Sequence, residues 1–406
     1  MFPRPKYVTT VVFSIFTLLF SFSSANALVF GEYLRYSLGY DKNEQSTRWI
    51  ACALIVTCSL LHGVSKRVGS MAQNALGTIK LATLVLVLFT CFYILVLPES
   101  LTGIPSNFEP GRFNVPSSFQ GSIYATALLK CIHSFGGWTT CHTVQNEIKG
   151  PIATLRKAGP LSIVAILILY ILLNLCYLKV IPYQDFIDSD QLAGALLFSR
   201  VYGRDLGAVL INLLIAISSA TNVIIVVYSD SIMNQEIFRE GFLPFSKQLC
   251  TNYPFGTPVF GILVHCIASC ALIYLPKNQV YNRIISVQYY PNQLFHAVLC
   301  LGLLFKLRTR FPNIHAPIRA STVTIYVCLV GSLSVVVSPF ISGSYYFTLA
   351  SLGTLAIGFI YWLVAFRIVP LVGRFHYVVV PRRKKDGLIY KQWIKDYDGE
   401  LSLLLV

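Results

Sequence analysis

Two adjacent glycines, Gly136 and Gly137, lie in the middle of a long apolar stretch and are the residues with the clearest chemical potential. Glycine weakens a helix by about 1 kcal/mol relative to alanine, and it lacks the side chain that keeps a ligand away from the backbone. A helix interrupted within a bilayer exposes N–H and C=O groups that hydrogen-bond a polar substrate. The alternative is close helix–helix packing, which small residues also permit. The predicted substrate-binding residues are Ser134, Phe135, Gly136, Gly137, Trp138 and Thr139.

A lysine at the start of another apolar run is the second candidate. Lys80 is followed by Leu-Ala-Thr-Leu-Val-Leu, which holds no charged residue. An ammonium inside hydrocarbon is costly, so such a residue marks an ion or proton pathway unless its side chain reaches the membrane surface. Both interpretations of Lys80 stay open on the residue pattern alone. Lys130 also lies within an apolar stretch and is predicted to face a cavity or a partner.

The cysteines and histidines predict neither a metal centre nor a disulfide framework. The 7 histidines are scattered singly and have no metal-ligand spacing. Of the 11 cysteines, Cys250 falls in a predicted inner loop and the others fall in apolar segments. No predicted outer loop holds a cysteine, which excludes an extracellular disulfide framework. No nucleophile triad or paired carboxylates occur within an apolar segment either, so we expect no enzyme activity, no cofactor and no metal.

The composition shows what surroundings these residues must have. Hydrophobic residues make up 55% of the 406 residues and charged residues only 12%, with a mean hydropathy of +0.64. Soluble domains carry about a quarter charged residues. A chain with so little polar sequence cannot coat a water-soluble globule, so the composition excludes a soluble enzyme and predicts a polytopic membrane protein.

About ten apolar stretches are long enough to cross a bilayer, which requires about 20 residues per helix. They are 7–30, 49–64, 76–97, 122–144, 161–181, 206–233, 259–275, 293–307, 323–340 and 345–366. Their continuous hydrophobicity predicts helices rather than barrel strands, so we expect an all-α fold. The first stretch also fits a signal peptide that ends at Ala25-Asn26-Ala27, but its serines favour a retained helix.

The distribution of positive charge predicts the orientation. If Met1 is cytoplasmic, about two thirds of the 32 Lys and Arg residues fall on the cytoplasmic side, as the positive-inside rule requires. Both termini are therefore expected to be cytoplasmic, with a transmembrane domain at 1–370 and a basic tail at 371–406. The net charge of +15 is mostly a topology signal. The cluster Arg382-Arg383-Lys384-Lys385 is expected to contact anionic lipid of the bilayer, not nucleic acid.

Several motifs resemble the L-type amino acid transporters of the amino acid/polyamine/organocation superfamily. They are Asn146-Glu147-Ile148-Lys149-Gly150-Pro151, Arg239-Glu240-Gly241-Phe242-Leu243-Pro244, and Gly63-Val64-Ser65-Lys66-Arg67-Val68-Gly69-Ser70 with the following Lys80. The opening Arg4-Pro5-Lys6-Tyr7 and the segment Ser24-Ala25-Asn26-Ala27-Leu28-Val29-Phe30-Gly31-Glu32-Tyr33 resemble the fungal methionine-permease branch. The resemblance covers the chain to about residue 370.

The resemblance implies a LeuT-like inverted-repeat fold. It implies secondary active transport of a neutral amino acid, either methionine-like or otherwise large, coupled to protons. The stretch 134–140 matches the unwound centre of the family's sixth helix, which binds the amino group of the substrate. Lys80 matches the lysine that takes the place of a sodium ion in proton-coupled relatives, with Ser218 and Ser219 as expected neighbours.

Counting from the family pattern, the first span corresponds to the third helix. The first two helices are then missing, and with them the Gly-Ser-Gly-type break that binds the substrate carboxylate. A second hypothesis is therefore a truncated, non-transporting permease paralogue or a membrane interaction or sensor protein. We expect the plasma membrane rather than the vacuole. The lack of cysteine between Glu32 and Arg48 argues against a disulfide-linked heavy chain.

Overall fold

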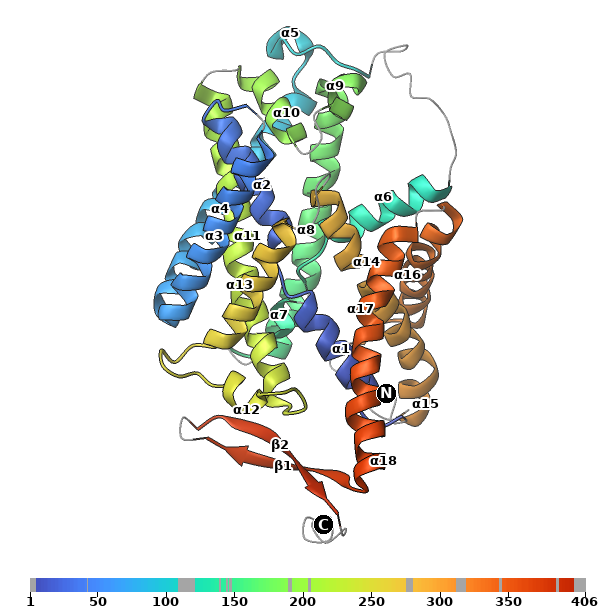
Figure 1. The fold of residues 1–406 in the computed structure, drawn as a ribbon. Helices are drawn as coiled ribbons and strands as arrows, with labels where there is room; N and C mark the ends of the chain where they lie inside the picture. Colours follow the sequence, from blue (N-terminus) through green and yellow to red (C-terminus); the bar gives the residue numbers. More distant parts are fainter. Residues whose placement is uncertain are drawn as a thin grey trace. The chain divides into compact units, whose positions relative to one another are not determined.

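The computed structural model describes residues 5–41, 43–108, 121–138, 140–143, 145, 148–188, 192–203, 206–274, 280–311, 319–342, 345–384 and 387–397. These residues are mostly helical and form two compact units (Figure 1). Unit 1 comprises Met1–Phe22, Gln120–Glu147 and Tyr228–Val406, and unit 2 comprises Ser23–Phe119 and Ile148–Val227. The long helix α11 (Leu206–Arg239) contributes residues to both units.

Six segments of the described chain are long and apolar enough to cross a membrane. They are Val8–Ser37, Glu44–Val64, Lys66–Val96, Pro151–Val180, Val209–Arg239 and Leu352–Gly373, and the shorter apolar helices are Val259–Tyr274 and Thr322–Val337. Because lipid offers no hydrogen-bonding partner, these segments satisfy most of their backbone groups within helices, and Val8–Ser37 does so in two, α1 and α2. The predicted helical membrane architecture is confirmed.

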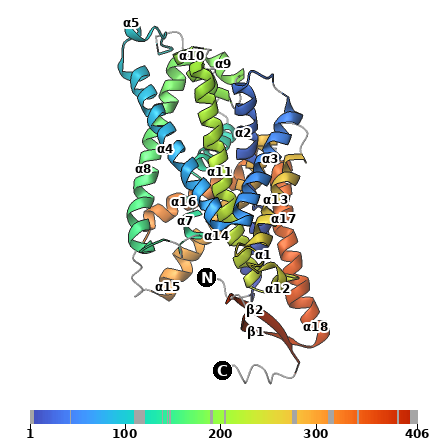
Figure 2. The ribbon, with the colours of Figure 1, turned by 90° about the vertical axis from the view of Figure 1, so that its left-hand side faces the viewer.

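Unit 2 is a group of packed helices. Its elements are α2 (Ser24–Ser37), α3 (Glu44–Val64), α4 (Lys66–Val96), α5 (Glu99–Thr102), α8 (Pro151–Val180), α9 (Tyr183–Asp188), α10 (Ala193–Tyr202) and the first part of α11. Helix α2 packs on α3, α3 on α4, and α4 on α8, which runs beside it in Figure 2. Side-chain caps begin two of these helices, because Asn43 Oδ1 accepts from Ser46 N and Ser65 Oγ accepts from Val68 N.

Unit 1 contains the remaining helices and one hairpin. Its helices are α1 (Val8–Leu19), α6 (Gly121–Ser134), α7 (Thr140–Thr143), α12 (Ser246–Leu249), α13 (Val259–Tyr274), α14 (Val280–Gly302), α15 (Arg308–Arg310), α16 (Thr322–Ser342), α17 (Tyr345–Leu363) and α18 (Val369–Gly373). π-Helical turns at Leu303–Leu307 and Val364–Ile368 follow α14 and α17. Helix α14 packs on α16 and α17, and α1 packs on α17 and α13.

Two predicted spans are interrupted in the structure. The first predicted span contains α1 and α2, which are separated at Phe20–Ser23. Serine hydroxyls compete with helical hydrogen bonding, and the segment that follows Phe20 is rich in serine. The predicted span 122–144 is likewise divided into α6 and α7. The break between α1 and α2 is not predicted, because average hydrophobicity does not register it, whereas the break between α6 and α7 contains the predicted Gly136 and Gly137.

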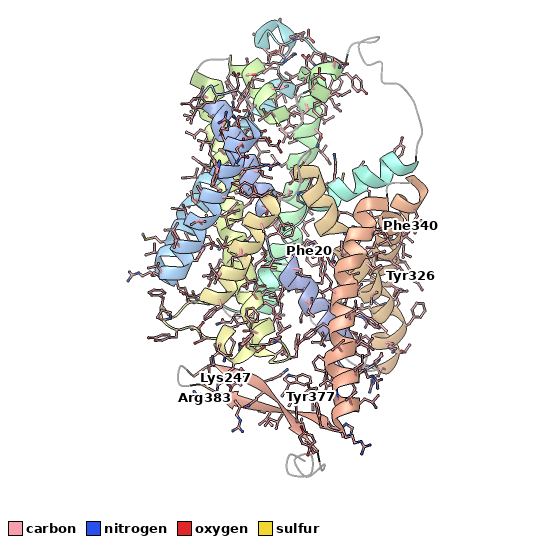
Figure 3. All side chains as sticks on the ribbon, viewed as in Figure 1. Phe20, Lys247, Tyr326, Phe340, Tyr377 and Arg383 are labelled. Carbon is pink, nitrogen blue, oxygen red and sulfur yellow. The ribbon has the colours of Figure 1, made fainter. Side chains whose placement is uncertain are left out.

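A β-hairpin follows the last helix, within the predicted basic tail 371–406. Strands β1 (His376–Arg383) and β2 (Ile389–Asp396) pair antiparallel, with His376 opposite Asp396. The hairpin, which carries the labelled Tyr377 and Arg383 in Figure 3, is an element that composition did not predict. It is tied to the end of α11, where Trp393 Nε1 donates to Glu240 O over 2.8 Å.

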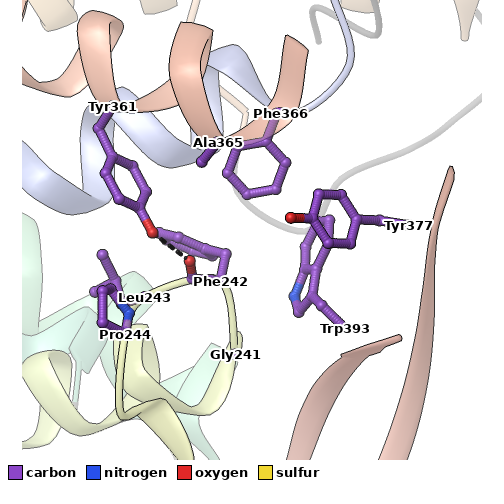
Figure 4. A pocket seen from close by; sticks show the side chains of 9 residues that line it. All are labelled: Gly241, Phe242, Leu243, Pro244, Tyr361, Ala365, Phe366, Tyr377 and Trp393. Carbon is purple, nitrogen blue, oxygen red and sulfur yellow. Dashed lines mark hydrogen bonds between the residues drawn. The ribbon is translucent and has the colours of Figure 1, made fainter. Parts of the chain in front are cut away.

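The hairpin lines one side of a small aromatic cavity of about 270 Å³ (Figure 4). Its lining residues are Gly241, Phe242, Leu243, Pro244, Tyr361, Ala365, Phe366, Tyr377 and Trp393. The rings of Phe366 and Trp393 meet edge to face with centroids 5.1 Å apart, and Tyr361 Oη donates to Phe242 O over 2.7 Å. Burial in this cluster raises the pKa of Tyr377. These contacts fix the first part of the tail against α17.

Candidate functional site

The predicted break in the Gly136–Gly137 region is present. Helix α6 ends at Ser134 and α7 begins at Thr140. Gly136 N donates to His133 O over 2.9 Å and closes the last turn, and Gly137 then adopts a φ of +98°. Only glycine occupies this backbone region without strain. The interruption is thus a consequence of the glycine pair.

The residues of this break lie open in unit 1. Gly136 and Gly137 are exposed, and among the described residues, its chain neighbours aside, no atom lies within 4 Å of a Cβ placed on Gly137. The indole of Trp138 is 52% exposed and lies 6.2 Å from the ring of His142 and 6.3 Å from that of His296. Sequence reasoning did not identify either histidine as a neighbour of the break. His142 follows Trp138 by only four residues, whereas His296 comes from the distant helix α14.

Two of the predicted substrate-binding residues, Ser134 and Thr139, are not shown facing the break. Ser134 Oγ donates back to Lys130 O over 3.0 Å, within its own helix. Thr139 lies outside the described residues. Phe135 is half-buried and Lys130 is exposed. The backbone of the break, rather than the hydroxyl of Ser134, is therefore the accessible polar surface.

Lys80 contacts helix α11 inside unit 2. Its Nζ donates to Asn222 Oδ1 over 2.5 Å. One turn earlier on α4, Leu76 O accepts from Thr221 Oγ1 at 3.4 Å. Lys80 makes no ion pair among the residues that the structure describes. Its ammonium is held by a neutral amide oxygen, and this bond favours a buried role for Lys80 over extension to the membrane surface.

The two serines predicted beside Lys80 lie on the same helix as Asn222. Ser218 is partly buried and Ser219 is 8% exposed. Asn222 follows Ser218 by four residues, so both lie on one face of α11. Sequence reasoning missed Asn222, although this spacing from Ser218 was a usable signal.

A buried histidine fixes the helices that carry Lys80. His62 of α3 is 2% exposed, and its Nε2 lies 3.2 Å from Ile224 O of α11. Helix α4 passes so close that a Cβ on Gly69 would lie 2.2 Å from His62 Nδ1. We call the bonded pair Lys80 and Asn222, together with Ser218 and Ser219 on the same helix as Asn222, the Lys80 cluster. The cluster belongs to unit 2 and the glycine break belongs to unit 1.

Comparison of the sequence with known families identifies the family of this chain. The profile described as amino acid permease matches residues 1–366. The chain belongs to the amino acid permease family. Members of this family are membrane transporters, so this permease is a multi-pass integral membrane protein for amino acid transport and not an enzyme.

Individual relatives carry more specific names. The chain is 34% identical to the low-affinity methionine permease of Saccharomyces cerevisiae, over 97% of this chain and 74% of the relative. It is 24% identical to the high-affinity methionine permease of the same yeast, over 99% of this chain and 72% of that relative. The large neutral amino acids transporter small subunit 2 of Mus musculus is 25% identical over 68% of this chain and 50% of its own length. The predicted resemblance to L-type transporters and to the methionine-permease branch is confirmed.

Proposed function

We propose that this permease carries methionine or another large neutral amino acid across the membrane in symport with protons. The observation that carries the proposal is the 34% identity, over 97% of the chain, to a protein named a methionine permease. A second relative has the same substrate in its name, and a third is named for large neutral amino acids. All three names point to an uncharged side chain on the substrate.

We assign substrate binding to the glycine break. The backbone at Gly136 and Gly137 is exposed, and apart from the Gly136 N–H, which bonds His133 O, its polar groups are open to a zwitterion. Trp138, which is half exposed, offers a ring to the substrate side chain. A thioether sulfur makes favourable contacts with aromatic rings, worth about 0.3–1.5 kcal/mol. The exposed backbone suits the charged groups of methionine, and the indole of Trp138 suits its thioether.

We assign proton coupling to the Lys80 cluster. An ammonium beside a carboxylate is held in its charged form, whereas one beside a neutral amide lacks that electrostatic support. Lys80 and Asn222 form the second kind of pair. Loss of the proton leaves an amine that still hydrogen-bonds, so both protonation states fit between α4 and α11. Ser218 and Ser219 supply further hydroxyl oxygens on the same helix.

The remaining assignments concern location and partners. We place the permease in the plasma membrane. We place both termini in the cytoplasm, because Lys and Arg concentrate on that side. Exposed Arg382 and Arg383 of the hairpin contact anionic lipid. The segment between Glu32 and Arg48 has no cysteine to join a heavy chain.

The experiment is transport by the purified permease in proteoliposomes. We expect radiolabelled methionine to accumulate when a proton gradient is imposed, and to exchange with internal methionine in counterflow without one. Lys80→Met should lose gradient-driven accumulation and keep counterflow, whereas Gly137→Leu should lose both. Gly103→Leu is the matched control, because Gly103 also has a positive φ (+64°) and open space around its Cβ but lies outside the break.

One result would contradict the proposal. If the folded protein shows neither uptake nor counterflow with methionine and other large neutral amino acids, the non-transporting alternative is favoured instead.

A further inference from the structure

A second buried polar cluster lies in unit 1, outside the residues assigned to substrate binding and coupling. His265 of α13 is 0% exposed and Asn234 of α11 is 0% exposed. Ser21 directly follows the labelled Phe20 at the end of α1 (Figure 3) and is also buried. The side chain of Asp230, on α11, is 31% exposed. We call these four residues the His265 cluster.

One nitrogen atom of His265 faces two oxygens from different elements. Nδ1 lies 3.2 Å from Ser21 Oγ and 3.5 Å from Asp230 Oδ2. Asn234 Nδ2 donates to Ser21 Oγ over 2.9 Å and to Gly261 O, one turn before His265, over 3.1 Å. The cluster therefore joins the end of α1 to α11 and α13.

Only one of the two oxygens can bond an unprotonated Nδ1. Because Ser21 Oγ already accepts from Asn234, its own proton is available to a neutral Nδ1, which accepts it. A carboxylate cannot donate, so Asp230 bonds this atom only when Nδ1 carries a proton. That N–H···O⁻ bond is charge-assisted and stronger than a neutral one. Proton binding therefore transfers the bond of His265 from Ser21 to Asp230.

We propose that the His265 cluster is a proton-binding site of the permease, separate from Lys80, whose occupancy controls the contact between the end of α1 and α13. A proton arrives on the partly exposed Asp230 carboxyl and passes to His265 Nδ1, which leaves an imidazolium beside a carboxylate. Ser21 is then released from Nδ1 and keeps its bond from Asn234. The proposal rests on the proton-coupled transport proposed above, and it adds a site for the coupling ion.

Few other groups near the cluster titrate. In the described chain, α1 has no charged or titratable residue from Val8 to Leu19. On the unit 1 part of α11, Glu236 is paired with Arg239, and Tyr228 is a phenol. The other titratable residues of α13 are Cys266, Cys270 and Tyr274. Thiols and phenols ionise above neutral pH, whereas imidazole changes charge between about pH 5 and 8.

The first test needs no transport. In the purified protein labelled with ¹⁵N on histidine, the signal lost in His265→Asn identifies this imidazole, and we expect its position to change with pH as Nδ1 gains its proton. Asp230→Asn removes the acceptor of the protonated form, so the signal should change at a more acidic pH. Ser21→Ala removes the donor to the neutral form, so the signal should change at a more alkaline pH. A purely structural histidine that does not titrate, or that ignores both substitutions, would overturn the proposal.

The second test measures coupling in proteoliposomes. Wild-type uptake of methionine should rise as the external pH falls, and His265→Asn and Asp230→Asn should flatten this rise while counterflow persists. His376→Asn is the control, because His376 is exposed at the start of the hairpin, outside the residues assigned to transport, and this variant should keep the wild-type pH profile. An unchanged profile in His265→Asn, with counterflow intact, would refute the inference. Absence of all counterflow would instead refute the proposed function, and the titration would still decide the proton site.

Discussion

The hydrogen bond between Lys80 and Asn222 shows which of several polar residues on α11 contacts the ammonium. Four polar residues, Ser218, Ser219, Thr221 and Asn222, occupy two turns of α11, and each could face a neighbouring helix. The packing of α4 on α11 directs Asn222 to the ammonium and Thr221 to Leu76 O. The choice depends on helix rotation, which residue types alone do not specify.

The first prediction concerns Asn222. Replacing it by leucine leaves the Lys80 ammonium without its acceptor, and a hydrogen bond to a charged group is worth about 1.5–3 kcal/mol. We expect Asn222→Leu to lower gradient-driven methionine uptake roughly tenfold or more, as measured by initial rates in proteoliposomes. Asn212→Leu on the same helix is the control, because Asn212 is buried and its Oδ1 has no hydrogen-bond partner among the described residues. Equal rates in the two variants would show that Asn222 does not serve Lys80.

At the scale of elements, interruptions and close contacts matter more than average hydrophobicity. The break after α6 arises from its glycines, and the separation of α1 from α2 follows a run of serines. The hairpin is an element of another kind. Its strands place the ring of Trp393 against Phe366, just after α17. They also contribute Lys391 to an exposed ion pair with Glu240. Exposed pairs contribute at most about 1 kcal/mol, so the rings stabilise the hairpin more than its charges do.

The second prediction concerns the contact between α3 and α4. A Cβ on Gly69 would lie 2.2 Å from His62 Nδ1, so Gly69→Ala forces the two helices apart or displaces the imidazole. Overpacking of this kind costs about 1–3 kcal/mol, and we expect a lower thermal unfolding temperature in detergent. Gly77→Ala on the same helix is the control, because nothing lies within 4 Å of its Cβ. It should match or exceed the wild type, since alanine favours helix by about 1 kcal/mol. Similar unfolding temperatures for both variants would contradict the close packing.

At the scale of the whole molecule, the distribution of basic residues and the long apolar helices define a multi-pass transporter. The described chain holds six long spans and two shorter apolar helices. The family match extends over residues 1–366, and the hairpin lies beyond it.

The third prediction concerns orientation. Because Lys and Arg stay on the cytoplasmic side, epitope tags fused before Met1 and after Val406 should bind antibody only in permeabilised cells. A tag inserted at Gly103, in an exposed turn between α4 and α6, should bind antibody on intact cells. Surface labelling of either terminal tag would reverse the proposed topology.

The sequence by itself determined the class of protein, the helical fold, the family and the position of the glycine break. Each of these depends on local composition or on residue order: long apolar runs force helices in lipid, and a glycine pair weakens the helix that contains it. Only the tertiary structure decided that Asn222 binds Lys80, that His296 lies beside Trp138, and that His265 faces both Ser21 and Asp230. These pairs come from segments far apart in the chain, and the rotation and packing of helices determine which side chains meet.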